Sequence, residues 1–437
     1  MNTLICAIII SIIGLINYRF SKKIFHPAVI FSGYWAILLL LLVVLPNDYY
    51  ALSNKTLLIF TTGILCFSYG GFLSRFVINS QSQPNYILSG TNETSSRSWI
   101  PSTLLAGLVL CVLLFPYYCY YLYQISLTHQ HEFLQYHYLN PLSKFFMTLR
   151  QAVVYNKGLG IFKYLIAWFG FLSLVALIEY YSHKTLKNKL IVVGFFITVL
   201  LYCLLTTARM AVIYFLFSFF SMYFILVRKL ELKKIFISGL FIICAFIIPA
   251  IIMHKGVHLN TGISSTSNLL SLIKNIELYL LGGIVAFNET VIYPVLTIPF
   301  PHDYSLSFFL KIAHLFNNDI IIPAAIFPYI NIPDPTNVYT LFFSWFLDFD
   351  WPGIIILFSI LGFITTLCFH YATRKNPIAL MFYAHIVAGL LLSNFFDAFL
   401  VGLSFWLQLF IFTFLIYKVP LVLNSFYKIK VKHASNS

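Results

Sequence analysis

The sequence predicts an all-α, polytopic integral membrane protein. Hydrophobic residues make up 60% of the chain and charged residues only 9%. A soluble fold lacks enough polar residues to cover its surface at this composition, whereas lipid can solvate apolar side chains. Apolar runs recur from one end of the chain to the other, and Lys and Arg alternate between the loops that separate them. This pattern excludes a disordered chain, a coiled coil and a secreted disulfide scaffold.

The apolar runs predict about eleven membrane-spanning helices, within a range of about ten to thirteen. We expect one polytopic membrane domain over residues 1–437. The first run is not a cleaved signal peptide, because no basic segment precedes it and its positive charges follow it. The expected spans are 2–18, 28–45, 56–74, 100–123, 158–181, 190–207, 210–227, 235–253, 353–371, 377–396 and 398–417.

Basic residues collect in alternate loops, which predicts the orientation of the chain. Lys and Arg favour the cytoplasmic flanks of membrane spans. We therefore expect the N-terminus in the periplasm and the C-terminus in the cytoplasm. The formal charge of +14 has the same origin, and no separate basic stripe indicates nucleic-acid binding. The predicted cytoplasmic groups are Arg19/Lys22/Lys23, Arg75/Arg97, Lys184/Lys187/Lys189, Arg228/Lys229/Lys233/Lys234, Arg374/Lys375 and Lys418/Lys428/Lys430/Lys432.

Two long segments are expected on the outer side, at about 124–157 and 254–352. The second is the large periplasmic segment of the predicted domain, and it is not hydrophilic. It contains the nearly apolar stretch Leu278–Ile298, which Glu289 interrupts. Interfacial or re-entrant helices suit such a segment, and an additional pair of spans is the alternative.

Several kinds of chemistry are excluded by the absence of their motifs. All seven cysteines lie in apolar runs and none forms CxxC, so we expect neither a disulfide framework nor a metal site. No P-loop or GxGxxG stretch is present, and we expect no cofactor. The cluster of His129, His131, Glu132 and His137 lacks the spacing of a zinc site.

Arg209 is the first candidate for function. It lies between two expected spans with almost no loop to keep it in water. A guanidinium at this depth can donate two hydrogen bonds to a phosphate or carboxylate. The alternative is an arginine whose side chain extends to the lipid headgroups.

A second candidate segment runs from Ile332 to Gly353. Its prolines favour an extended backbone, after which Thr336 or Asn337 can cap a short helix. Asn337 and Tyr339 carry groups suited to sugar hydroxyls. Tyr339, Phe342 and Trp345 are predicted as apolar platforms for sugar rings, and Asp348 as a support for the segment.

Titratable groups are scattered through the large outer segment. Lys255 and Lys274 could hold a diphosphate, and Glu289, His302 or Asp334 could take a proton from an attacking hydroxyl. For each, an ordinary solvated loop residue is the alternative. The full group is His254, Lys255, His258, Lys274, Glu277, Glu289, His302, Asp303, Lys311, His314 and Asp334.

At two motifs the chain resembles the oligosaccharide repeat-unit polymerases, also called O-antigen polymerases or Wzy proteins. The family carries a stretch like T-N-V-Y-T, followed by D-F-G and a further Gly. Here this stands as Thr336–Thr340 and Asp348–Gly353, with Asp350 where the family usually has Gly. The segment Thr206–Arg209 is similar to the family's Arg motif between two central spans.

The resemblance implies an enzyme of the bacterial inner membrane that joins oligosaccharide units carried on undecaprenyl diphosphate, at the periplasmic face. Partners implied by the family are the lipid-linked oligosaccharide, membrane lipid, a chain-length regulator and a flippase. An O-antigen ligase, a lipid-linked oligosaccharide flippase and a membrane O-acyltransferase remain the alternatives. The resemblance to T-N-V-Y-T favours the polymerase, and the large outer segment argues against a flippase.

Overall fold

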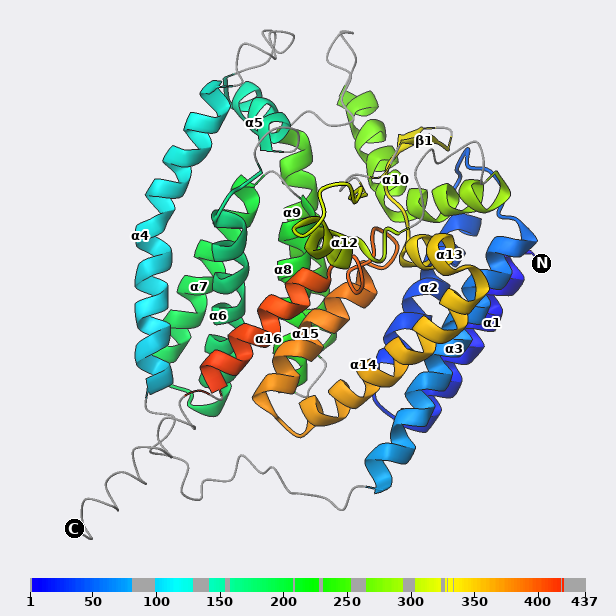
Figure 1. Cartoon of the computed structure of the whole chain (residues 1–437), viewed down its shortest axis with the longest axis horizontal. Helices are drawn as coiled ribbons and strands as arrows, with labels where there is room; N and C mark the ends of the chain where they lie inside the picture. Colours follow the sequence, from blue (N-terminus) through cyan, green and yellow to red (C-terminus); the bar gives the residue numbers. More distant parts are fainter. Residues whose placement is uncertain are drawn as a thin grey trace. The chain divides into compact units, whose positions relative to one another are not determined.

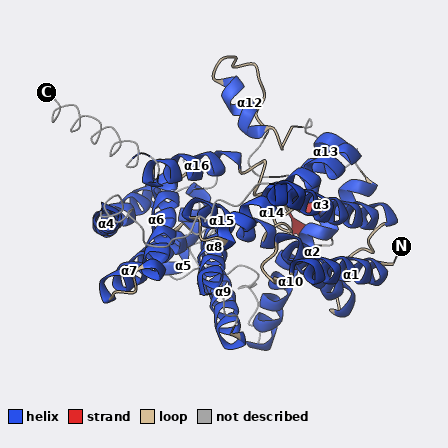
Figure 2. Ribbon diagram, turned by 90° about the horizontal axis from the view of Figure 1, so that it is seen from below, coloured by secondary structure: helices blue, strands red, loops and turns tan. Residues whose placement is uncertain are grey.

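The computed structural model describes residues 2–80, 99–128, 141–153, 158–206, 209–227, 231–252, 265–293, 303–323, 327, 329–332, 334–417 and 419. This part of the chain is almost entirely helical and contains one two-stranded sheet (Figures 1 and 2). The predicted all-α class is confirmed for the described residues.

Eight of the described helical segments are long and apolar enough to cross a membrane. The larger number of about eleven spans stays a prediction. The eight are Thr3–Ser21, Pro27–Val44, Asn54–Ile78, Trp99–Leu127, Phe162–Ser182, Leu186–Leu205, Arg209–Val227 and Leu341–Thr373. Two shorter apolar helices are α15 (Pro377–Leu391) and α16 (Leu403–Tyr417).

Contacts within the chain divide it into two compact units. Unit 1 comprises Met1–Asn85, Ile273–Arg374 and His385–Leu407, and unit 2 comprises Tyr86–Leu272, Lys375–Ala384 and Gln408–Ser437. The N-terminal helices and the segment Thr336–Gly353 therefore belong to the same unit, although more than 250 residues separate them in the sequence.

Unit 1 has an aromatic core between its helices. Phe342 lies at its centre, with ring centroids 4.4 Å from Phe358, 4.9 Å from Trp35 and 5.0 Å from Phe60. These rings come from α2, α3, α13 and α14, so they join both ends of the unit's sequence. The helices are α1 (Thr3–Ser21), α2 (Pro27–Val44), α3 (Asn54–Ser80), α10 (Ser265–Ile292), α12 (Ser307–His314), α13 (Leu341–Pro352), the π-helical turn η3 (Gly353–Leu357) and α14 (Phe358–Thr373).

Glycines let α3 and α14 pack backbone to backbone. A Cβ atom at Gly70 would overlap the carbonyl oxygen of Ser359, and one at Gly362 would overlap that of Phe67. Without a hydrophobic driving force in lipid, close packing at small residues is a main source of helix association. The two glycines therefore fix this helix pair.

Unit 2 contains a second helical bundle. Its helices are α4 (Trp99–Thr128), α5 (Pro141–Ala152), α6 (Phe162–Ser182), α7 (Leu186–Leu205), α8 (Arg209–Val227) and α9 (Leu232–Ile252). The Tyr202 hydroxyl on α7 donates to the carbonyl of Cys111 on α4 at 3.0 Å. Its ring packs 4.8 Å from that of Tyr118.

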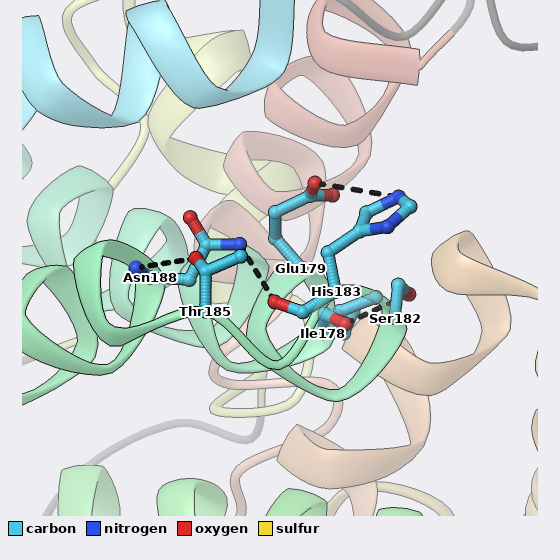
Figure 3. A network of polar contacts seen from close by, with 6 residues as sticks. All are labelled: Ile178, Glu179, Ser182, His183, Thr185 and Asn188. Atoms are coloured by element: carbon cyan, nitrogen blue, oxygen red, sulfur yellow. Dashed lines mark hydrogen bonds and ion pairs between the residues drawn. The ribbon is translucent and has the colours of Figure 1, made fainter.

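Polar contacts close the turn between α6 and α7 (Figure 3). The Thr185 hydroxyl accepts a hydrogen bond from the backbone N–H of Asn188 at 3.1 Å and so caps α7. The Asn188 side chain donates to the His183 carbonyl at 2.9 Å, and Glu179 lies 3.9 Å from the His183 ring. The turn therefore satisfies its own polar groups.

A buried carboxylate organises the turn between α15 and α16. Asp397 is only 2% exposed. One of its oxygens accepts from the indole N–H of Trp345 at 2.7 Å and from the Ser344 hydroxyl at 3.2 Å. Both oxygens also accept backbone N–H groups, from Phe399 at 2.8 Å, Leu400 at 3.0 Å and Val401 at 3.3 Å. Burial raises the pKa of Asp397, and these hydrogen bonds act in the opposite direction.

The same turn contacts two other helices, α2 and α10. The Trp35 indole on α2 donates to the Ser393 hydroxyl at 3.0 Å, and the Tyr34 hydroxyl donates to the side-chain oxygen of Asn394. The Asn394 amide donates to the Leu280 carbonyl on α10 at 2.8 Å. We call residues 393–397 the polar turn. It separates α15 from α16, so both helices are shorter than the spans predicted at 377–396 and 398–417.

Replacing Asp397 with Ala should strongly destabilise unit 1. The change leaves five hydrogen-bond donors without their acceptor, and breaking a buried charged network costs about 3–5 kcal/mol. Thermal unfolding of the detergent-purified protein measures the effect. Asp319→Ala is the matched control, because Asp319 is exposed. Equal melting temperatures for the two variants would contradict this role for Asp397.

Candidate functional site

The candidate segment that runs from Ile332 to Gly353 is preceded by and overlaps a small hairpin in unit 1. Strands β1 (Ile330–Asn331) and β2 (Pro335–Thr336) are antiparallel, with Ile330 opposite Thr336. Ile332 in the turn is buried, and its side chain approaches Gly282 of α10, where a Cβ atom would lie 3.3 Å away. The hairpin therefore packs on α10, and the extended backbone predicted around Pro335 is present.

Asn337 does not cap a helix, so the predicted capping role of Thr336 or Asn337 is wrong. Helix α13 begins at Leu341, and its N-cap residue is Thr340, without a side-chain capping bond. The backbone N–H of Leu341 instead donates to the Ser393 carbonyl of the polar turn at 2.6 Å. Thr336 accepts from the N–H of Val338 at 3.2 Å. A tertiary contact thus replaces the cap, and the Asn337 side chain is half-buried.

The three predicted ring platforms are part of the core. Tyr339 is 0% exposed, and its ring stacks on Phe343 with centroids 4.2 Å apart. Phe342 and Trp345 are also buried. A sugar cannot reach these ring faces without opening the core, so we correct the role of Tyr339 from sugar contact to packing. Burial also raises the pKa of Tyr339.

Asp348 holds the segment that precedes α12. Its two carboxylate oxygens accept the backbone N–H groups of Asp303 at 2.8 Å and Ser305 at 2.6 Å. Asp303 has a positive φ of 107°, which few residues other than glycine adopt readily. The supporting role predicted for Asp348 is therefore a specific one: it positions residues 303–305.

The backbone breaks within the motif, at Asp350. This residue has φ 51° and ψ −142°, a conformation that normally belongs to glycine. Beyond the break, a Cβ atom at Gly353 would overlap the carbonyl oxygen of Trp345. The break redirects the chain from α13 into η3 and α14. The glycine-like geometry is thus present although the residue is Asp.

Three carboxylates and a lysine interact electrostatically at the hairpin. Glu277 on α10 interacts electrostatically with Lys274, Asp48 and Asp334. We call Asp48, Glu277 and Asp334 the acid cluster. Burial raises the pKa of Glu277, the charges of Asp48 and Asp334 raise it further, and Lys274 lowers it. Burial raises the pKa of the neighbouring Tyr49, and the negative charges of the same three acids raise it further.

The acid cluster combines predicted and unexpected residues. Asp334 and Lys274 were predicted as site residues, whereas Asp48 and Tyr49 were not considered. Glu277 was noted only as one of many titratable groups. Asp48 and Tyr49 precede α3, more than two hundred residues from Glu277, so no local pattern indicates the association. The only signal in the sequence is an acid in a short loop between two expected spans.

Glu289 belongs to a different part of α10. It lies roughly three helical turns beyond Glu277. It is half-buried and accepts from the Asn288 amide at 3.2 Å. The Asn288 oxygen in turn accepts from the N–H of Ser53 at 2.7 Å and the hydroxyl of Thr56 at 2.8 Å. Burial raises the pKa of Glu289, and the Asn288 bond opposes this. Asn288 was missed by the sequence analysis.

Arg209 is the first residue of α8, in unit 2. It is 4% exposed, and its guanidinium lies 5.0 Å from the centre of the Phe246 ring. Burial of this kind does not fit a side chain that extends into the lipid headgroups. A cation held against an aromatic face is desolvated and rigid, as recognition of an anion requires.

Two predicted site residues, Lys255 and His302, lie outside the described residues, as do His129, Glu132 and the other histidines of that loop. Comparison with known proteins adds no assignment: no family model, no curated protein and no solved structure matches this chain. The chemistry of the described residues and the resemblance in the motif are therefore the grounds for a function.

Replacing Asp350 with Gly should stabilise the protein. The backbone conformation of Asp350 costs about 1–3 kcal/mol for a residue with a Cβ, and Gly removes this strain at a smaller entropic cost. We expect a higher melting temperature for Asp350→Gly and a lower one for Asp350→Val. A fall in melting temperature with Asp350→Gly would mean that the Asp side chain itself stabilises the break.

Proposed function

We propose that this chain polymerises oligosaccharide units carried on undecaprenyl diphosphate, at the periplasmic face of a bacterial inner membrane. The observation that carries the proposal is the segment Thr336–Gly353. It resembles the polymerase motif in sequence, and in the structure it combines a non-capping Asn337 with a glycine-like break at Asp350. The acid cluster lies beside the hairpin that leads into this segment.

The reaction needs a proton acceptor. A hydroxyl of the acceptor sugar attacks the anomeric carbon of the donor, the bond between that carbon and the phosphate oxygen breaks, and undecaprenyl diphosphate leaves. Glu277 is the best-placed described base, because a carboxylate whose pKa is raised towards the working pH accepts a proton more effectively. Burial raises the pKa of Glu277, and the charges of Asp334 and Asp48 raise it further.

The leaving diphosphate needs fixed positive charge. We assign this role to Arg209; Lys274 and Lys255 keep their predicted role in holding the diphosphate, and His302 keeps its predicted role as a proton acceptor. Arg209 can bind two phosphate oxygens at once through its planar guanidinium, which a lysine cannot do. Preorganised cations stabilise the negative charge that develops on the diphosphate as the sugar departs.

Asn337 is assigned to the sugar. Its amide can both donate and accept hydrogen bonds, as a pair of sugar hydroxyls requires. The side chain is not needed as a helix cap, because α13 begins at Leu341 with Thr340 as its N-cap residue. Glu289 is assigned a positioning role through Asn288, which joins α10 to the start of α3. Asp348 positions residues 303–305, next to His302.

Deletion of the gene, with complementation by variants, tests the polymerase assignment. Surface polysaccharide should collapse to single repeat units on a gel, whereas a ligase deletion would leave polymer on its carrier and a flippase deletion would accumulate lipid-linked units internally. Asn337→Ala should also yield single units or short chains, at normal protein level and melting temperature. Asn337→Asp keeps the size of the side chain but loses its donor, and we expect it to be similarly impaired. Full-length polymer from both variants would remove Asn337 from the site.

The charges of the acid cluster should set the pH dependence of polymerisation. Activity falls at low pH as Glu277 becomes protonated. Asp48→Asn removes a negative neighbour, so it lowers the pKa of Glu277 and shifts the acidic limb to lower pH. Lys274→Gln removes a positive neighbour and shifts the limb to higher pH. Polymerisation of purified lipid-linked units at a series of pH values measures both, with Asp319→Asn as control. Shifts in the same direction for both variants would exclude Glu277 as the base.

A further inference from the structure

Basic residues gather where α1, α3 and α14 end and α2 begins, at the helix ends opposite to those near the acid cluster. Lys22 and Lys23 lie in the turn between α1 and α2, Arg75 near the end of α3, and Arg374 directly after α14. The stretches 19–28, 70–80 and 366–376 contain no Asp or Glu. Folding thus brings cations together without acidic side chains of their own segments to neutralise them.

Ring contacts bring these segments together around Phe369 of α14. The His26 ring meets Phe369 edge to face, with centroids 5.4 Å apart. The Lys23 ammonium lies 5.4 Å from the centre of the same ring. Arg75 is one helical turn beyond Gly71, which packs against Thr366 of α14 closely enough that a Cβ atom would lie 2.8 Å from its hydroxyl. His370 is likewise one turn beyond Thr366.

His26 is a buried polar residue among these basic side chains. It is 4% exposed, and its Nδ1 atom has no hydrogen-bond partner. Burial, then the charges of Arg75 and Lys23, lower the pKa of His26 to about 3, so its imidazole is neutral. The Nε2 atom of His370 is also buried without a partner. Unsatisfied buried groups are rare and require an explanation.

The helix geometry adds a further preference for an anion. His26 is the N-cap residue of α2, and it makes no side-chain capping bond. The N-terminus of this 18-residue helix carries partial positive charge. Pro27 has no N–H, and the N–H groups of Val29 and Ile30 already donate to the His26 carbonyl, so the preference comes from the helix dipole. Imidazole N–H, guanidinium and ammonium donors around a helix N-terminus are together typical of a phosphate site.

The surroundings of the cations indicate what carries the phosphate. Phe20, Ile24, Phe72 and Phe76 flank the basic residues in the sequence and are exposed. Exposed apolar side chains beside cations suit the boundary between acyl chains and headgroups. Basic pockets between membrane helices bind the headgroups of anionic lipids.

We propose that Lys23, His26, Arg75 and Arg374 bind the phosphate of an anionic phospholipid at the N-terminus of α2. The bound phosphate accepts from the neutral imidazole and neutralises the surrounding charge. The acyl chains lie along the exposed aromatic and aliphatic side chains of α1 and α3. The lipid thereby holds the ends of α1, α2, α3 and α14 together, at the face where the basic loops place the cytoplasm. This proposal does not depend on the polymerase function.

Native mass spectrometry of the full chain tests the proposal, after extraction from vesicles of phosphatidylcholine with and without phosphatidylglycerol. The protein should retain phosphatidylglycerol in preference to phosphatidylcholine. The double variant K23Q/R75Q should reduce this retention by roughly tenfold or more, since each basic residue near the surface contributes about a factor of five. The control K187Q/K189Q removes the same charge at the N-terminus of α7, where the buried Asn188 is already hydrogen-bonded. Equal losses in both double variants, or no loss in K23Q/R75Q, would overturn the site.

The variant His26→Leu distinguishes a role of His26 in lipid binding from a role in stabilising the fold. It should lower phosphatidylglycerol retention several-fold without lowering the melting temperature in phosphatidylcholine alone, because the buried nitrogen has no partner there. A lower melting temperature in phosphatidylcholine would instead show that His26 is structural and would overturn its assignment.

Addition of inorganic phosphate tests whether the bound phosphate belongs to a lipid or is free phosphate. We expect it to leave phosphatidylglycerol bound, and displacement would show that the site takes free phosphate and not a lipid.

Discussion

A carboxylate buried in an apolar environment must have its oxygens satisfied, and unit 1 depends on how it meets this constraint at Asp397. Five donors converge on the two oxygens: two are side chains of α13, and three are backbone N–H groups of the residues that follow Asp397. Because the Trp345 and Ser344 side chains are held in this way, the start of α13 is fixed against the polar turn. The Ser393 carbonyl then accepts the first free N–H of the helix.

The position of α13 in turn determines the geometry of the segment Thr336–Gly353, which contains this helix. Upstream, the chain enters from a hairpin that packs on α10 through Ile332 and Gly282. Downstream, Asp348 holds residues 303–305, and Asp350 reverses the backbone so that Gly353 can approach Trp345. The motif therefore acts mainly through the backbone. Its aromatic residues pack the core, whereas the Asn337 side chain is half-buried.

Unit 1 carries opposite charges at opposite helix ends. Asp48 and Glu277 belong to the end where α2 finishes and α3 begins, and Lys23 and Arg75 to the end where α2 begins and α3 finishes. Burial raises the pKa of Glu277 at one end; the charges of Asp48 and Asp334 add to this effect, and Lys274 opposes it. At the other end, burial and then the charges of Arg75 and Lys23 lower the pKa of His26.

Composition and hydropathy alone determine the all-α class and most span positions, because twenty apolar residues form a helix in lipid whatever their neighbours are. The sequence also locates the motif segment, Arg209, Asp334 and Lys274. It does not reveal that the Ser393 carbonyl replaces the helix cap at Leu341, or that the charge of Asp48 acts on Glu277. Each of these depends on the approach of residues far apart in the chain, and local periodicity carries no information about such pairs. Only the tertiary structure brings them together, through the polar turn and the packing of α10 and α13.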